Sequence, residues 1–221
     1  MSLKLDWVDH KTAEQSVFRY HYSRKMPRGK LAKIGVWEND KFIGVVIYGR
    51  GASPKVLERH AGLKNNAHFV ALCRVALSKH QNHVTKIVAI SIKMLRKHNK
   101  GLKAIVSFAD TRQGHLGKIY QAGNWDYVGL AAKNSDGYKI YGQDTHKKTM
   151  DRHHKKFQKL TLKENYKGTF LDYLKEYLDP NVEVLKGSPK HKYIYCLDKE
   201  TKMFVDQHRK PYPTSNADIV Y

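Results

Sequence analysis

The stretch FADTRQGHLGKIYQAGNW, residues 108–125, decides the fold of this 221-residue chain. An apolar run over 102–108 leads into Asp110 and a glycine-containing turn, and a short helix predicted over 114–122 ends at Gly123. A further apolar run begins at Tyr127. A strand, a helix and a strand in this order are typical of an α/β sheet, in which ligands gather at the carboxyl ends of strands. Asp110 is therefore a candidate for metal binding or proton transfer, with a helix N-cap as the structural alternative.

The residues on the amino-terminal side of this stretch alternate between helical and strand-like patterns. Residues 34–37 and 42–48 are apolar runs joined by Asn39 and Asp40, which predicts a β-hairpin. The other patterns predict helices over 11–20, 54–62 and 84–97 and a strand over 68–77. Strands that alternate with helices in this way indicate an α/β fold with a mixed sheet flanked by helices.

The pattern of the chain changes after residue 143. A basic helical stretch is followed by a helix over 170–178, a strand over 193–197 and a helix that ends at Arg209. Because there is no tandem repeat and no Gly/Ser-rich linker, the sequence predicts a single domain over 1–221. Its expected parts are an α/β core over 1–143, a basic and partly helical carboxy-terminal elaboration over 144–213, and a tail over 214–221.

The charge of the chain points to a polyanionic partner. Lys and Arg number 41 against 20 Asp and Glu, so the net charge is +21, and 13 histidines add to it as the pH falls. Such an excess disfavours a cationic substrate and favours nucleic acid or an acidic membrane surface. The basic residues cluster at 24–33, 146–167 and 186–192. One such run is typical of a solvated face, but three of them in so basic a chain favour polyphosphate binding.

Cysteine content and hydropathy exclude several classes of protein. The two cysteines, Cys73 and Cys196, are too few for a disulfide scaffold or a four-thiolate zinc site. No apolar run reaches the roughly 18 residues of a transmembrane helix, and the first residues lack the apolar core of a signal peptide. We therefore expect a cytoplasmic protein with no membrane partner.

Two further positions are candidates for chemistry. His21 and Tyr22 lie between the first predicted helix and a basic loop. His21 can act as a base or a metal ligand and Tyr22 as a proton donor or a ligand, whereas the alternative for His21 is an exposed surface residue. Arg74 interrupts the apolar strand over 68–77, so it either meets an anion or lies on the solvent side of the pleat.

Common metal and nucleotide motifs are absent from the sequence. Neither HExxH nor CxxC occurs, so any metal site needs residues that are distant in sequence, such as His21 and Asp110. Neither GxxxxGK[ST] nor GxGxxG occurs, so ATP chemistry and Rossmann-type dinucleotide chemistry have no support.

Several motifs resemble known families. Residues 116–129 resemble the helix–turn–strand segment LYEKLGFxxVG of the GNAT superfamily of N-acetyltransferases, with Tyr120 in the place of its tyrosine. More specifically, residues 108–125 resemble the signature ADxxxGHxGxIYQAxNW of the phage Mom family. Other positions fit that family's remaining motifs in order: His21, Tyr22 and Ser23 with Pro27 and Gly29, then Arg74, Asn82 and residues 190–198. The resemblance runs from about residue 20 to residue 213.

The resemblance implies a GNAT-like mixed sheet whose central strands splay to form a cleft. It implies an enzyme that adds a carbamoylmethyl (acetamido) group to the exocyclic amine of adenine in DNA, which protects phage DNA from host restriction. By motif, the catalytic residues are His21, Tyr22, Arg74, Asp110 and Tyr120. A ferrous ion is implied as well, with His21, Tyr22 and Asp110 as its expected ligands, a donor mixture that suits iron.

The implied reaction sets requirements on DNA binding. The exocyclic amine is paired inside the duplex, so the base has to swing out into a pocket, where Tyr22, Tyr120 or Trp125 can stack on it. Arg74 is expected to bind an oxygen of the donor or intermediate. Expected substrate and DNA contacts are Ser23, Arg24, Lys25, Arg28, Asn82, His115, Trp125, Arg152, Lys155 and Lys156. Double-stranded DNA in the cytoplasm of the bacterial host is the expected partner, and a homodimer is an open option.

One departure from the GNAT pattern concerns the donor. The glycine-rich loop that binds the donor's diphosphate is missing, because SKHQNHVT, residues 78–85, follows the strand over 68–77. Acetyl-CoA or a related donor therefore stays an open expectation. Two alternative functions also stay open: an N-acetyltransferase for a small amine or a protein, and a non-catalytic nucleic-acid-binding protein on this scaffold.

Overall fold

The computed structural model describes residues 2–50, 54–131, 137–146 and 150–217. The chain forms two compact units, one of Met1–Leu130 with His191–Asn216 and the other of Ala131–Lys190 with Ala217–Tyr221. Among the residues described, no helix is long and apolar enough to cross a membrane.

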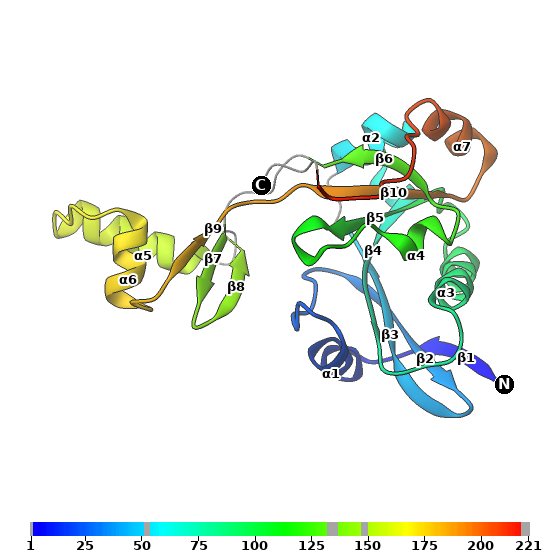
Figure 1. The fold of residues 1–221 in the computed structure, drawn as a ribbon, viewed down its shortest axis with the longest axis horizontal. Helices are drawn as coiled ribbons and strands as arrows, with labels where there is room; N and C mark the ends of the chain where they lie inside the picture. The colour runs from blue at the N-terminus through cyan, green and yellow to red at the C-terminus, as the bar shows by residue number, and fades with distance from the viewer. Residues whose placement is uncertain (1, 51–53, 132–136, 147–149, 218–221) are drawn as a thin grey trace. The chain divides into compact units, whose positions relative to one another are not determined.

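The first unit is built on a mixed seven-stranded sheet (Figure 1). Its strand order is β1-β2-β3-β4-β5-β10-β6. The four strands at one end pair antiparallel, β4 and β5 pair parallel, and β10 and β6 pair antiparallel. The strands are β1 (Leu3–Trp7), β2 (Leu31–Glu38), β3 (Lys41–Gly49), β4 (Phe69–Leu77), β5 (Ala104–Asp110), β6 (Asp126–Leu130) and β10 (Lys190–Cys196).

Helices cover both faces of this sheet. One face carries α3 (Val84–His98), whose Ile87 and Ile92 pack in one core cluster with Ile105 of β5. On the opposite face, α2 (Pro54–Ala61) and α7 (Lys199–Asp206) pack in a cluster with Val106, and α1 (His10–Tyr20) packs against Val45. Neighbouring residues of one strand serve different clusters because side chains alternate across a sheet. The predicted α/β fold, with a mixed sheet flanked by helices, is confirmed.

The sheet splays between β4 and β5. Parallel pairing covers only Phe69↔Ala104, Val70↔Ile105 and Ala71↔Val106, after which the two strands separate. At the point of separation, the Ser107 hydroxyl donates to the carbonyl oxygen of Leu72 at 2.9 Å. A side chain therefore satisfies the carbonyl that the next ladder bond would have used, and the splay opens beyond it.

The predicted hairpin is confirmed, whereas the predicted helix over residues 114–122 is shorter than expected. Asn39 and Asp40 both have positive φ (48° and 61°), as a two-residue turn between antiparallel strands requires. Gly114 and Gly117 also have positive φ, which interrupts the helical pattern. That segment forms the 3₁₀ turn η2 (Thr111–Gln113) and then the short helix α4 (Lys118–Gln121).

The second unit has a small core of its own. A three-stranded sheet, ordered β8-β7-β9, accompanies two helices. Its core is formed by Ile140, Met150, Tyr173, Leu174 and Val182. Its elements are β7 (Gly137–Ile140), β8 (Gln143–His146), α5 (Asp151–Lys163), α6 (Phe170–Tyr177) and β9 (Glu183–Leu185).

The units divide the chain near residues 130 and 190 rather than at 143. The strand and helix predicted beyond residue 190 are β10 and α7, and they complete the seven-stranded sheet instead of extending the basic part. The basic stretch is thus an insertion between two paired strands, β6 and β10. Residues 218–221 of the predicted tail and 147–149 of the basic run lie outside the described residues. That the whole chain behaves as one domain stays a prediction.

Candidate active site

The His21–Tyr22–Ser23 motif lies where α1 ends. Asp9 caps the start of α1 by accepting a hydrogen bond from the Thr12 backbone at 2.8 Å, and His21 closes the helix through a bond from its N–H to Val17. His21 itself has an extended backbone (φ −110°, ψ 134°). The helix end therefore directs the motif away from α1 and into the basic loop.

His21 is held in one tautomer by Ser23. The Ser23 backbone N–H donates to His21 Nδ1 at 3.1 Å, and the Ser23 hydroxyl lies 2.8 Å from the same nitrogen. Because a backbone N–H can only donate, Nδ1 accepts, and the proton of the neutral ring lies on Nε2. Burial, with smaller effects of Arg74 and His115, lowers the pKa of His21 to about 4. His21 is thus a neutral ring that offers an Nε2–H donor at physiological pH.

Tyr22 brings together residues that are far apart in sequence. Its ring centroid lies 4.3 Å from that of His21 and 5.4 Å, edge-on, from that of His115. Desolvation first, and the carboxylate of Asp110 second, raise the pKa of Tyr22, while Arg74 lowers it. The end of α1, the strand β4 and the end of β5 therefore all supply side chains that affect Tyr22, and the catalytic role of these residues stays a prediction.

Arg74 ties the basic loop to the sheet. Its Nη1 donates to the carbonyl of Cys73 at 2.7 Å, and its Nε and Nη2 both donate to the carbonyl of Lys25 at 3.3 Å. The side chain is half-buried rather than turned fully to solvent. Its two other N–H groups have no hydrogen-bond partner in the part of the chain that is described. Arg74 can therefore position the loop and still bind an oxygen.

The position of Asp110 permits both of its expected roles, helix capping and a chemical role beside Tyr22. Its carboxylate accepts the Arg112 N–H at 3.1 Å and so caps η2, which is the structural alternative to a chemical role. The backbone carbonyl of Asp110 also accepts the His115 N–H at 3.2 Å. The same carboxylate is close enough to Tyr22 to change its pKa. The cap thus orients a charge that faces the converging side chains.

Tyr120 lies at the splay. Its hydroxyl is 2.8 Å from the hydroxyl of Ser107, and its ring packs between Trp125 and Tyr193 with centroid separations of 5.1 and 5.2 Å. Since the Ser107 proton is directed to the Leu72 carbonyl, Tyr120 donates to Ser107. Burial raises the pKa of Tyr120 to about 12, so the phenol keeps its proton at neutral pH. Sequence reasoning missed Ser107, since a buried serine within an apolar strand carries no motif.

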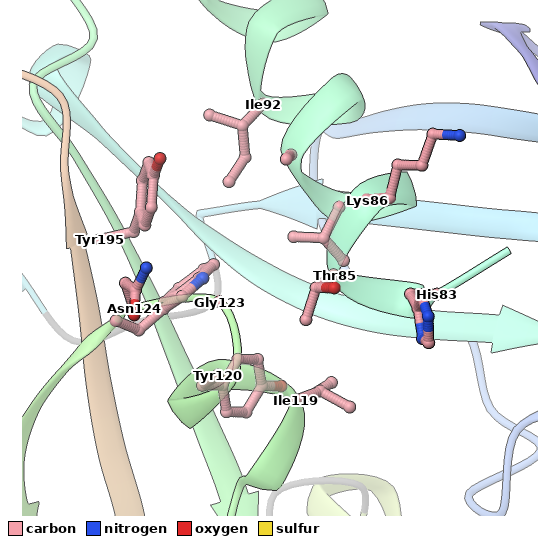
Figure 2. A pocket seen from close by; sticks show the side chains of 12 residues that line it. His83, Thr85, Lys86, Ile92, Ile119, Tyr120, Gly123, Asn124 and Tyr195 are labelled. Atoms are coloured by element: carbon pink, nitrogen blue, oxygen red, sulfur yellow. The ribbon is translucent and has the colours of Figure 1, made fainter.

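A cavity of about 330 Å³ lies between α3 and α4 (Figure 2). Tyr120 and Tyr195 line one side, and Thr85 and Ile92 of α3 line the other. Tyr120 therefore lines this cavity. It also lies close enough to Tyr22 and Arg74 for both of them to affect its pKa. The sequence did not indicate Thr85 or Ile92, because their role depends on which face of α3 meets α4.

The loop that precedes α3 is held by an internal carboxylate. Glu38, which is buried, accepts the backbone N–H of Gln81 at 2.8 Å, the backbone N–H of Asn82 at 2.7 Å and the Asn82 side-chain amide at 2.6 Å. These hydrogen bonds, with those from Asn82 the largest, lower the pKa of Glu38. The amides that a donor's diphosphate would need are therefore occupied. Asn82, predicted as a DNA contact, binds Glu38 instead.

The donor set does not fit an iron centre. Among the residues that are described, no three His, Cys, Asp or Glu side chains come close enough to share a metal ion. The Nδ1 atom of His21 already accepts from Ser23, and metal binding through Nε2 would need the tautomer that breaks this contact. The expectation that His21, Tyr22 and Asp110 hold Fe(II) is thus unsupported. Side chains can affect one another's pKa values without placing their donor atoms at bonding distance from one metal ion.

Apart from Asn82 and Trp125, the predicted DNA contacts fall into three groups. Arg24, Lys25 and Arg28 are exposed in the loop after α1. Ser23 and His115 contact the His21–Tyr22 pair directly. Arg152, Lys155 and Lys156 are exposed on α5 of the second unit.

Trp125 cannot stack on a base at the surface. Its side chain is only 2% exposed, and its ring packs against Tyr120 and Tyr195 in the core. It lines the cavity between α3 and α4 but does not project from it. The predicted stacking of Trp125 on a base that enters a pocket stays a prediction, and its burial restricts such a contact to this cavity.

Fold and site define an α/β protein with a splayed mixed sheet and a conjunction of His, Tyr, Arg and Asp side chains at the splay. The chain belongs to the Mom protein family, whose family model matches residues 2–214. It is 26% identical over 219 residues to the methylcarbamoylase mom of Escherichia phage Mu, which covers 96% of this chain and 83% of that protein.

Solved structures show distant similarities. An N-acetyltransferase from Staphylococcus aureus Mu50 is 12% identical and covers 89% of this chain and 99% of its own, with a TM-score of 0.48. Arabidopsis thaliana NAA60 in complex with acetyl-CoA is 8% identical and covers 90% of this chain and 100% of its own, with a TM-score of 0.46.

Proposed function

We propose that the protein is a transferase that adds a carbamoylmethyl group to the exocyclic amine of adenine in duplex DNA. Such a modification would protect phage DNA from restriction in the cytoplasm of the bacterial host. The observation that carries the proposal is the convergence of His21, Tyr22, Arg74 and Asp110 beside Tyr120, in a chain of the Mom family. The name of the phage Mu relative, a methylcarbamoylase, supports the same class of reaction.

Each group has a role that its geometry permits. The amine of a swung-out adenine attacks the methylene carbon of the donor, so the new N–C bond forms as the bond between that carbon and its leaving group breaks. Asp110 accepts the proton that the amine loses. Tyr120 keeps its proton at neutral pH, and its hydroxyl turns from Ser107 to supply that proton to the leaving group. The Nε2–H of His21 and the remaining N–H groups of Arg74 hold the carbonyl oxygen of the transferred group.

Double-stranded DNA suits the charge of the chain. The net charge of +21 gives a strong attraction for phosphates, and Arg24, Lys25 and Arg28 are exposed beside the converging residues. An acetyl-CoA-dependent N-acetyltransferase is less favoured, because Glu38 occupies the amides before α3. The donor is therefore expected to reach the cavity between α3 and α4 without using a diphosphate contact at this loop.

The test is mass spectrometry of nucleosides from a plasmid that is co-expressed with the protein. Wild type is expected to produce a carbamoylmethyl-deoxyadenosine. Asp110→Asn and Tyr120→Phe are expected to abolish it, while Lys97→Ala on the exposed end of α3 serves as the matched surface control. Soluble wild-type protein that leaves all deoxyadenosine unmodified would contradict the proposal.

A further inference from the structure

A buried lysine and a histidine meet on the sheet face that carries α2. Lys192 of β10 is only 7% exposed, and its ammonium lies 3.0 Å from Nε2 of His60 in α2. An ammonium can only donate, so Nε2 accepts and the proton of the neutral His60 ring lies on Nδ1. The pair thus places a positive charge and a ring N–H donor under α2.

The Nδ1–H of His60 lacks an acceptor. This nitrogen is buried and has no hydrogen-bond partner in the described part of the chain, where it is the one buried side-chain nitrogen or oxygen in that condition. Leaving a buried donor unpaired costs free energy, and native proteins rarely do so without a ligand or water in place. The site therefore lacks an acceptor atom.

More cations surround the pair. The His208 ring meets the His60 ring edge-on at 5.4 Å, and the Lys210 side chain lies over Gly129 of β6. Burial first, and then Lys192, His208, Arg59 and Lys210 in that order, lower the pKa of His60 to about 4. Burial, Arg59 and Lys210 lower the pKa of Lys192 as well. The charged groups that affect the pKa values of this pair are thus all positive.

Among the described residues, no carboxylate forms an ion pair with the cations of this cluster. None of Arg59, Lys192 and Lys210 forms an ion pair within the described ranges. The nearby carboxylates of Asp126 and Asp206 are paired with Lys202, and Asp126 also with Arg209. A cluster of cations with an unpaired buried N–H is what an anion-binding site requires.

The cluster lies on the face of the sheet that carries α1, the helix at whose end His21 lies. α1 and α2 both pack on the face opposite to α3, so His21 and His60 belong to helices of one face. β10 runs antiparallel to β5, because the N–H of Leu197 donates to the carbonyl of Lys103. Lys192, near the start of β10, is thus placed toward the carboxyl end of β5, where Asp110 lies.

We propose that Arg59, His60, Lys192 and Lys210 bind a phosphodiester group of the DNA backbone. This inference rests on the proposed function, since the duplex that supplies the target adenine would cross this face. Because Nδ1 of His60 is buried, the ring has to shift before one phosphate oxygen can accept its N–H, above the charge of Lys192. Arg59 and Lys210, which are exposed, close on the other oxygens. The contact positions the duplex and reads no sequence.

Binding of fluorescently labelled duplexes at several salt concentrations tests the site. Arg59→Ala and Lys210→Ala are each expected to weaken binding by about the same factor for two duplexes of unrelated sequence. Each is also expected to lower the slope of log affinity against log salt by about 0.9. Lys97→Ala, on α3 of the opposite face, should leave the slope unchanged. Slopes of the Arg59 and Lys210 variants that equal the control would overturn the proposal.

A second measurement reads the buried pair directly. In a ¹⁵N-labelled sample, the ring N–H of His60 should shift when a short duplex is added, and His60→Gln identifies the signal. Inorganic phosphate distinguishes the source of the anion, because a shift with phosphate but none with duplex would overturn the DNA assignment. No shift with either would overturn the site. Neither result affects the nucleoside measurement, so failure here is distinguishable from failure of the proposed function.

Discussion

The backbone N–H of Ser23 donates to Nδ1 of His21 at 3.1 Å, and this one contact determines what His21 can do. With Nδ1 occupied, the neutral ring carries its proton on Nε2. His21 is then a hydrogen-bond donor rather than a base or a metal ligand. Its lowered pKa, about 4, keeps it in this form across the physiological pH range.

Stability should fall as the solution is acidified from about pH 6.5 towards pH 4. His21 and His60 both have pKa values of about 4 in the folded protein, below the usual 6.5, so the unfolded chain binds protons that the folded chain does not. Their contribution is fully present above pH 6.5 and is lost as the pH drops through this window. Urea unfolding at pH 7, 6, 5 and 4 measures it, and His60→Gln should flatten the curve. A steeper curve for that variant would contradict the assignment.

Asp110→Asn should distinguish the capping of η2 by Asp110 from the role of its negative charge. Asparagine can still accept the Arg112 N–H, so the free energy of unfolding should stay within about 0.5 kcal/mol of wild type. Modification of DNA should fall by at least about 100-fold, because the amide cannot take a proton. Asp110→Ala should lose both, with a destabilisation of about 1 kcal/mol. Equal activity of wild type and Asp110→Asn would exclude a proton-accepting role.

Tyr120→Phe tests the phenol at the splay. The variant keeps the ring packed against Trp125 and Tyr193 but removes the hydroxyl that meets Ser107. We expect a loss of about 1 kcal/mol in unfolding free energy and a fall of about 100-fold or more in modified deoxyadenosine. Ser107→Ala is the matched control, because it removes the same hydrogen bond and leaves the phenol in place. If both variants lose activity equally, the phenol acts only through its position.

The hydrogen bonds of Glu38 predict how tightly the protein binds an acyl-group donor that carries a diphosphate. Because the Gln81 and Asn82 amides are occupied, acetyl-CoA should bind no more tightly than acetyl-pantetheine, which lacks the diphosphate. Isothermal titration calorimetry compares the two. Glu38→Ala should destabilise the protein by about 2 kcal/mol, since it removes charge-assisted hydrogen bonds to three partly buried N–H groups. Binding of acetyl-CoA that is tenfold tighter than that of acetyl-pantetheine would show that the loop takes a phosphate.

The second unit should bind phosphates of its own. Changing Arg152, Lys155 and Lys156 on α5 together to glutamine should weaken duplex binding and lower the salt slope by about 0.9 for each phosphate that the variant no longer neutralises. Lys175→Gln, which is exposed on α6 of the same unit, is the control. An unchanged slope for the triple variant would assign DNA binding to the first unit alone.

Much of the secondary structure could be predicted from local sequence. The apolar spacing of residues 84–97 predicted α3, and Asn39 with Asp40 predicted the hairpin, because both signals depend on residues that are neighbours in the chain. The strands β1, β7, β8 and β9 were missed because they are short; β1 alternates apolar and polar residues, but only over five positions. The helix over 114–122 was overestimated, because Gly114 and Gly117 adopt positive φ.

Local sequence patterns and composition specified the α/β order and the net charge, and the family motifs pointed to the residues near the splay. How these residues contact one another depends on long-range packing and pairing. The three-residue pairing of β4 with β5 opens the sheet, Ser23 selects the His21 tautomer, and Glu38 takes the amides before α3. Trp125 is likewise buried by long-range packing, since its ring contacts Tyr195 of β10. Local patterns reflect the preferences of a few adjacent residues, whereas these contacts join strands and loops that only packing and pairing over the whole chain bring together.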